Sequence, residues 1–456
     1  MVDVQAYLDA QREKDLDKLF EFLRIPSVSA LSQHKRDMLR AAEWLVRELQ
    51  ELGMQNVRKI DAGGHPIVYA ERIEDPALPT ALIYGHYDVQ PVDPEALWTT
   101  PPFEPNIRNG RIYARGASDD KGQVFMHMRA LKAHLATRGR LPLNVRLVIE
   151  GEEEVGSESL GRYVESAPEL KADVVVISDT SMPAIDAPAI CYSLRGIAVL
   201  EMTVRGAASD LHSGLFGGAV PNPLHELARL VASLHDDAGR VNVPGFYDDV
   251  LPLTAEERAM LARLPFDEEE YKASLGLKEL YGEAGYTTIE RIGARPTLEL
   301  NGMWGGFQGE GSKTVIPAEA HAKITCRLVP DQDPEKIADL VASALAERAH
   351  PSVTVDVRRG HGGAPWICSP DDPAIQAGMR ALEQAFAASP LLMRMGGSIP
   401  VVGNLDRVLR APIVLMGFAL PTDQVHAPNE NFSLQAFDKG SLALALYWDE
   451  LARALA

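Results

Sequence analysis

Five short segments of the sequence hold histidine or acidic residues, most of them directly after an apolar run. They are Gly85-His86-Tyr87-Asp88, Ser118-Asp119-Asp120, Glu152-Glu153-Glu154, Ser178-Asp179 and Asp423-Gln424-Val425-His426. In open α/β sheets, ligands gather at the carboxyl ends of the strands. We therefore expect these polar side chains to meet at one edge of a sheet.

Two imidazoles and three carboxylates in these segments form a suitable ligand set for zinc or manganese. They are His86, Asp119, Glu154, Asp179 and His426. Two divalent ions that share a bridging carboxylate need about this many protein ligands, and they keep open positions for water and substrate. The set therefore favours a two-ion hydrolytic site.

Each segment alone also has an ordinary explanation. A single histidine beside a strand is more often a satisfied core or surface residue, and Asp119-Asp120 could cap a helix that begins near Lys121. The run Glu152–Glu154 could be a solvated stretch of charge. The joint occurrence of all five segments on one α/β pattern favours the metal site over these alternatives.

The elements that would position these residues form an α/β pattern. Apolar stripes predict helices that end before Pro26 and near Gly53, and strands alternate with helices from His65 to Ile177. This alternation predicts an α/β/α sandwich with a largely parallel sheet. Residues 362–456 show the same alternation of helices and strands, so we expect them to complete this catalytic domain, whose first segment is 1–195.

Residues 196–361 read as an inserted domain. Their order of strand, helix, strand, strand, helix, strand predicts a ferredoxin-like α+β unit, which could serve as a lid and dimerisation domain. The stretch 240–295 within it is charged, helical and punctuated by proline. No motif explains that stretch.

Composition excludes several classes of partner. The 45 Lys and Arg against 64 Asp and Glu give a net charge of −19, which disfavours nucleic acid and anionic membranes. No apolar run is long enough to span a bilayer, and the first residues lack the apolar core of a signal peptide. The three cysteines are far apart, so we expect a reducing, cytoplasmic setting.

Several motifs together resemble one known family over nearly the whole chain. They are Gly-His-Tyr-Asp-Val-Gln-Pro at 85–91, Arg-Gly-Ala-Ser-Asp-Asp-Lys-Gly at 115–122, Glu-Gly-Glu-Glu-Glu-Val-Gly-Ser at 150–157, Asp-Leu-His-Ser-Gly at 210–214 and Gly-Gly-Ser-Ile-Pro at 396–400. The sequence is similar to the dinuclear-metal exopeptidases and deacylases, which include acetylornithine deacetylase, succinyl-diaminopimelate desuccinylase and glutamate carboxypeptidase. The last motif points to the branch of carnosinase and cytosolic non-specific dipeptidase.

The resemblance implies a role for each candidate residue. Asp119 would bridge two ions, zinc first, with manganese or cobalt as alternatives. His86 and Asp179 would hold one ion, and Glu154 and His426 the other. Glu153 would be the general base toward a metal-bridging water, and Asp88 would orient His86. The remaining matches are His212, an oxyanion donor supplied across a homodimer, and the substrate contacts Thr314, Arg327 and Ser398.

One position departs from the family pattern and leaves the substrate open. Dipeptidase relatives often carry a Glu that can pair with the substrate amine, where this sequence has Met395. The leading prediction is hydrolysis of the amide bond of dipeptides or dipeptide-like substrates. An amidohydrolase for N-acyl or N-carbamoyl amino acids is the alternative, and a non-catalytic binding protein of the same fold is a more remote one.

Overall fold

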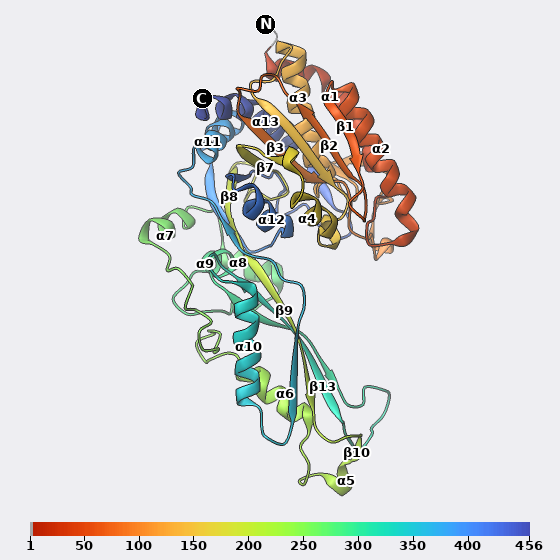
Figure 1. The fold of residues 1–456 in the computed structure, drawn as a ribbon, viewed down its shortest axis with the longest axis vertical. Coiled ribbons are helices and arrows are strands. Elements are labelled where there is room, and N and C mark those ends of the chain that lie inside the picture. The colour runs from red at the N-terminus through yellow and green to blue at the C-terminus, as the bar shows by residue number, and fades with distance from the viewer. Residues whose placement is uncertain (1–2) are drawn as a thin grey trace.

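The computed structural model describes residues 3–456, and most of the chain surrounds one nine-stranded sheet (Figure 1). Its strand order is β1-β2-β6-β3-β7-β17-β8-β15, with β16 beside β8. The strands are β1 (Gln55–Ile60), β2 (Ile67–Arg72), β3 (Thr80–His86), β6 (Asn144–Glu150), β7 (Val174–Ile177), β8 (Ala189–Leu194), β15 (Trp366–Ile367), β16 (Leu391–Met395) and β17 (Ile413–Leu415).

The four central strands of this sheet run parallel to one another, in the order β6-β3-β7-β17. The flanking pairs β1-β2, β2-β6 and β17-β8 are antiparallel. Every residue of β7 is buried, as expected for a parallel strand that is covered on both faces. The parallel centre matters for function because it brings the ends of β3, β6 and β7 to one edge.

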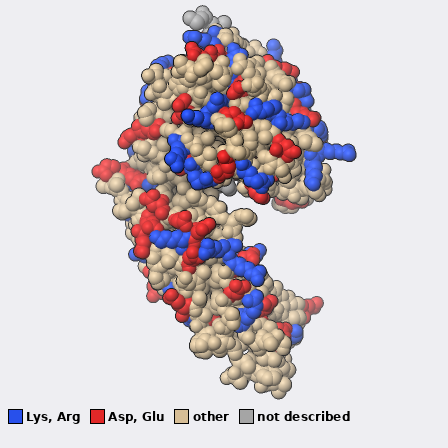
Figure 2. Space-filling model, in the orientation of Figure 1, with Lys and Arg blue, Asp and Glu red and all other residues tan. Residues whose placement is uncertain are grey.

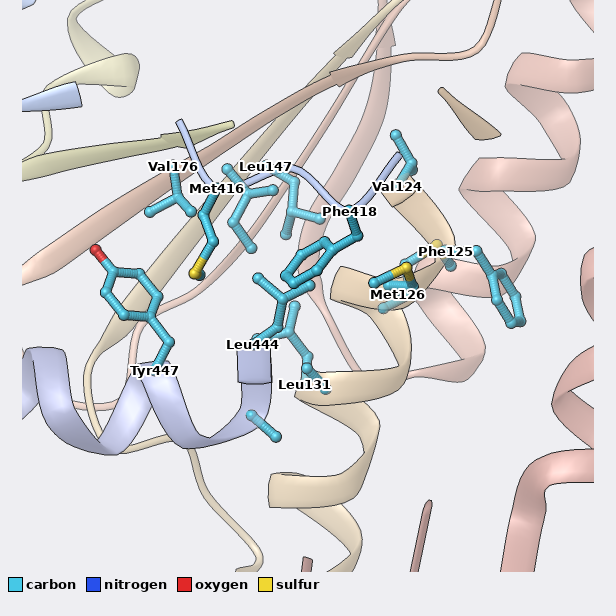
Figure 3. Packing of buried hydrophobic residues seen from close by; sticks show 14 of the residues in the cluster. Val124, Phe125, Met126, Leu131, Leu147, Val176, Met416, Phe418, Leu444 and Tyr447 are labelled. Atoms are coloured by element: carbon cyan, nitrogen blue, oxygen red, sulfur yellow. The ribbon is translucent and has the colours of Figure 1, made fainter. Parts of the chain in front are cut away.

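Helices cover both faces of the large sheet and complete an α/β/α sandwich. One face carries α1 (Val4–Leu23), α2 (Lys35–Glu51), α3 (Lys121–Arg138), α11 (Pro373–Phe386) and α13 (Leu434–Ala454). Figure 3 shows this core, in which Leu147 and Val176 of the sheet face Leu131 of α3 and Leu444 of α13. The opposite face carries α4 (Glu158–Val164) and α12 (Pro400–Leu409).

A second, four-stranded antiparallel sheet extends away from the sandwich (Figure 1). Its order is β11-β13-β9-β14, from β9 (Gly196–Arg205), β11 (Thr297–Gly305), β13 (Glu319–Leu328) and β14 (Thr354–Arg359). Helices α6 (Pro223–Ala232) and α10 (Pro334–Arg348) pack on it around a separate apolar core. Its chain order and sheet order are those of a ferredoxin-like unit.

The remaining elements are short. The tip of the second unit holds β10 (Leu211–His212), α5 (Ser213–Phe216) and β12 (Val315–Ile316), and the 240–295 stretch forms α7 (Ala255–Leu261), α8 (Glu268–Leu275) and α9 (Thr288–Ala294). A three-stranded sheet joins β4 (Asn106–Arg108), β5 (Arg111–Tyr113) and β18 (Asn431–Ser433). Short 3-10 turns are η1 (Ser32–His34), η2 (Glu95–Leu97), η3 (Glu153–Val155) and η4 (Pro168–Leu170).

The predicted fold class, a sandwich with an inserted ferredoxin-like unit, is confirmed. The chain leaves the large sheet at Leu194 and enters the small one at Gly196, and β15 returns it to the large sheet. The boundaries 1–195, 196–361 and 362–456 stay a prediction, which we propose on these crossings. Within residues 3–456, no helix combines the length and hydrophobicity of a membrane span. The cytoplasmic location also stays a prediction.

Candidate metal centre and active site

Three parallel strands place the first candidate residues at one edge of the large sheet. β3 ends at His86, β6 leads into the turn η3 with Glu153 and Glu154, and Asp179 follows β7. These strands are neighbours in the order β6-β3-β7, so their carboxyl ends lie together. Asp119 reaches the same edge from the loop before α3, and the Asp119–Asp120 peptide is cis.

The candidate ligands form two groups that share Asp119. In the first, His86 Nε2 lies 3.0 Å from Asp119 Oδ1 and 3.8 Å from an oxygen of Asp179. In the second, His426 Nε2 lies 2.9 Å from Asp119 Oδ2 and 3.2 Å from Glu154 Oε2. Within each group the ligand atoms lie within 4.8 Å of one another, so each group could hold one ion, with Asp119 between the two.

The electrostatics of these groups fit dication binding. Hydrogen bonds to Asp119 and Glu154 raise the pKa of His426 to about 10. Burial lowers the pKa of His86, but hydrogen bonds to Asp119 and Asp88 outweigh burial and raise it well above its ordinary value. In the absence of metal, protons on the two imidazoles therefore balance the charge of the clustered carboxylates, which would otherwise repel one another. Metal ions displace such protons, because metal ligands must be deprotonated.

Glu153 lies beside the two groups and has the properties of a general base. Burial is the main cause that raises the pKa of its carboxyl to about 7, and nearby carboxylates add to it. A base is most effective when its pKa is near the working pH. Glu153 ligates in neither group, so its carboxylate is available for proton transfer.

Asp88 connects the histidine ligand to the turn that holds Glu153. Its backbone carbonyl accepts a hydrogen bond from His86 Nδ1 at 3.1 Å, and its carboxylate lies 3.4 Å from the same nitrogen. The two carboxylate oxygens accept the backbone N–H groups of Glu153 and Glu154 at 3.2 and 3.1 Å. One fully buried side chain therefore sets the positions of a ligand, a base and a second ligand.

Glu430 organises the loop that carries Asp119, although no motif in the sequence singles it out. Its oxygens accept Arg115 Nη1 at 2.8 Å and the backbone N–H groups of Gly116, Ser118 and Asp119 at 3.0, 3.0 and 3.1 Å. Glu430 lies four residues after His426, whose φ of +61° is in the left-handed region. These hydrogen bonds therefore connect the loop that carries His426 to the loop that carries Asp119.

Glu430→Ala should lower the free energy of unfolding by about 3–5 kcal/mol, because it leaves the buried Arg115 guanidinium without its carboxylate. Urea unfolding followed by circular dichroism measures this loss. The control is Glu104→Ala, which removes an exposed carboxylate and should change stability by no more than about 0.5 kcal/mol. Equal stability of the two variants would show that the Arg115–Glu430 pair contributes nothing.

Two further candidates, Arg327 and Ser398, meet where the two sheets join. Arg327 Nη1 donates to Ser398 Oγ at 2.9 Å, and that hydroxyl donates to the backbone carbonyl of Arg195 at 2.5 Å. Arg195 was not predicted, and burial together with Arg327 lowers its pKa to about 10. A pair of neighbouring guanidinium groups is suited to a carboxylate ligand.

His212 and Thr314 lie apart from the other candidates. β10, which holds His212, lies at the tip of the second unit, at the opposite end of the molecule from β3 and β7 (Figure 1). Ser213 N donates to Thr314 O at 3.0 Å, so the two candidates share this tip, where both are exposed. The structure therefore brings together the metal groups, Glu153 and Asp88, but not His212 or Thr314.

The model of the peptidase family M20/M25/M40 matches residues 82–450. The chain belongs to this family. The predicted resemblance and the predicted enzyme class, a metallopeptidase, are confirmed.

Relatives of this M20 chain are similar over their whole lengths. The Cys-Gly metallodipeptidase dug1 of Schizosaccharomyces pombe is 33% identical and the human β-Ala-His dipeptidase 31% identical, over 98% of this chain and 97% and 92% of theirs. The structure of an M20 family metallo-carboxypeptidase from Sulfolobus solfataricus has a TM-score of 0.86 and 34% identity, covering 96% of this chain and 99% of its own.

Proposed function

We propose that this chain uses two divalent metal ions to hydrolyse the amide bond of dipeptides and dipeptide-like substrates. The observation that carries the proposal is the pair of ligand groups sharing Asp119, with the Glu153 carboxylate beside them. The relatives include dipeptidases and a metallo-carboxypeptidase, and all of these cleave the amide bond that precedes a C-terminal residue.

His86 and Asp179 would hold one ion, Glu154 and His426 the other, and Asp119 both. Two imidazoles and three carboxylates suit zinc first, with manganese or cobalt as alternatives. When bound, such ions polarise a carbonyl and acidify water. Glu153 then takes a proton from the attacking water and gives it to the leaving amine, while Asp88 keeps Glu153 and His86 in position.

Arg327 would bind the C-terminal carboxylate of the substrate. Its planar guanidinium suits bidentate binding of a carboxylate, and Ser398 orients it. The ordinary alternative for Arg327 is a strand-surface arginine. Its guanidinium is half-buried and, among residues 3–456, donates to the Ser398 hydroxyl and forms no ion pair with an acidic side chain, which supports a ligand role. Thr314 shares the tip with His212, so it would contact the substrate from that tip only in the homodimer proposed next.

We further propose that the chain acts as a homodimer in which His212 completes the site of the partner subunit. In the single chain, β10 lies far along the molecule from the metal groups (Figure 1). The tip also exposes apolar side chains, with Leu215 77% and Phe216 40% exposed. Figure 2 shows that few charged residues lie on this tip, which fits contact with another protein surface.

Removal of metal should abolish hydrolysis, and added zinc, manganese or cobalt should restore it. The test incubates the chelated protein with a panel of free, β-linked and N-acylated dipeptides and measures the released amino acid. Activity that persists in metal-free protein, as verified by elemental analysis, would contradict the proposed function.

A further inference from the structure

A cavity beside the candidate metal centre has a wall of apolar and uncharged polar residues, apart from two candidate ligand acids. Its volume is about 410 Å³, which is large enough for a small organic group. Asp119 and Asp179 lie at one side of it. The rest of the wall carries no charge. It holds the apolar residues Met395, Ala419, Leu420, Pro421 and Val425 and the polar residues Ser118, Gln123, Thr180, Ser181 and Gln424.

β16 directs an uncharged side chain toward this cavity and a charged one away from it. Successive side chains of a strand point to opposite faces. Met395, the last residue of β16, lines the cavity, whereas Arg394 bonds to the Tyr192 hydroxyl at 3.0 Å and pairs with Glu257. The position in β16 that reaches the cavity therefore offers a thioether, which is flexible and adapts to apolar groups.

The described residues of the wall hold no carboxylate that is free to pair with an ammonium group. The two acids, Asp119 and Asp179, belong to the candidate ligand groups. The Gln123 side chain already has hydrogen-bond partners, since its amide nitrogen donates to Ser118 O at 3.0 Å and its amide oxygen accepts the Phe418 backbone N–H at 2.7 Å. With two dications in place, the ligand carboxylates would be engaged by the ions and would not be free to pair with an ammonium group in the cavity.

A free dipeptide brings an ammonium group to this site at neutral pH, because an α-amino group has a pKa of about 7.7–8.0. Placing that charge in a cavity that offers it no free carboxylate costs free energy. An N-acyl group has no charge to desolvate, and its apolar part can pack against Met395 and Leu420. The cavity wall therefore discriminates by charge on the amino side of the scissile bond.

We propose that this cavity binds the amino side of the substrate and selects N-acylated or longer peptidyl substrates over dipeptides with a free amine. The proposal rests on the proposed function and names its substrate class. Met395 acts as a specificity-determining residue that contacts the substrate.

The test compares kcat/KM at pH 7 for Met-Ala and N-acetyl-Met-Ala with the same added metal. The wild-type chain should prefer the acetylated substrate by about tenfold or more, which corresponds to about 1.4 kcal/mol. Met395→Glu should raise kcat/KM for the free dipeptide and lower it for the acetylated one. Met395→Leu is the matched control, which keeps an apolar side chain and should keep the wild-type preference.

Equal rates on the two substrates, or a wild-type preference for the free dipeptide, would overturn the proposal. This comparison needs only the wild-type chain, so it decides even if Met395→Glu does not fold. Hydrolysis of neither substrate in the metal-loaded protein would instead count against the proposed function, so the two failures are distinguishable.

Discussion

Glu153→Gln is expected to leave two metal ions on each chain and to remove most of the turnover. Glutamine has the size of glutamate and keeps the backbone N–H that Asp88 accepts at 3.2 Å. It cannot take a proton from water, however. General acid–base catalysis contributes about 10²–10⁴-fold, so a fall in kcat of at least this size is expected.

The informative contrast is with the two neighbouring glutamates. Glu154→Gln alters a candidate ligand and should lower metal content together with activity. Glu152 accepts the backbone N–H groups of His65 and Ser159 at 2.9 and 3.2 Å, so Glu152→Gln should retain most activity. Elemental analysis and kcat on the same samples separate the three roles. Full activity of Glu153→Gln would exclude it as the base.

The fold was predictable from the sequence where patterns are local. The parallel strands β7 and β17 are uniformly apolar, and the order of elements from 197 to 357 matches the ferredoxin-like unit observed. β8, β16 and α12 were not predicted. β16 has the sequence Leu-Leu-Met-Arg-Met, which shows neither regular apolar–polar alternation nor an apolar run long enough to predict a strand. Its side chains are also only partly buried in the structure.

His86, Glu154 and Asp179 could be found because they end or follow a strand, and Asp119 because it precedes a helix, which places them at one edge of a parallel sheet. His426 lies inside the loop between β17 and β18, and only the family resemblance gave it a role. Glu430 could not be found in this way. Its burial depends on Arg115, more than 300 residues away in sequence, and a lone glutamate in a loop is usually solvated. The one feature that could have indicated burial of Glu430 is its position directly before the short buried strand β18, which holds Asn431 and Phe432.

Among changes that would act through the proposed homodimer, replacement of His212 is expected to lower kcat the most. His212→Ala should lower kcat by about 10²–10³-fold, the loss that follows removal of one oxyanion donor. The variant should retain its metal content, because His212 lies at the tip and belongs to neither ligand group. Neither this variant nor Glu153→Gln alone should then show appreciable turnover.

A mixed dimer of these two variants should regain one working site. The His212→Ala chain keeps its own Glu153 and would receive His212 from the Glu153→Gln partner. Random mixing makes about half of the dimers mixed, each with one intact site of two, so about a quarter of wild-type activity is expected. Mixing is achieved by unfolding and refolding the two chains together, and native mass spectrometry verifies the dimers.

A second mixture controls for recovery that has another cause. The His212→Ala chain is mixed with a chain that carries both His212→Ala and Glu153→Gln, so no His212 is present on either side. Sharing across the interface predicts recovery in the first mixture and none in the second. If mixed dimers form and the first mixture stays inactive, His212 does not act from a partner. Its tip would then have to reach Asp119 of its own chain by closure of the second unit on the sandwich, because β10 and β3 lie at opposite ends of the molecule (Figure 1).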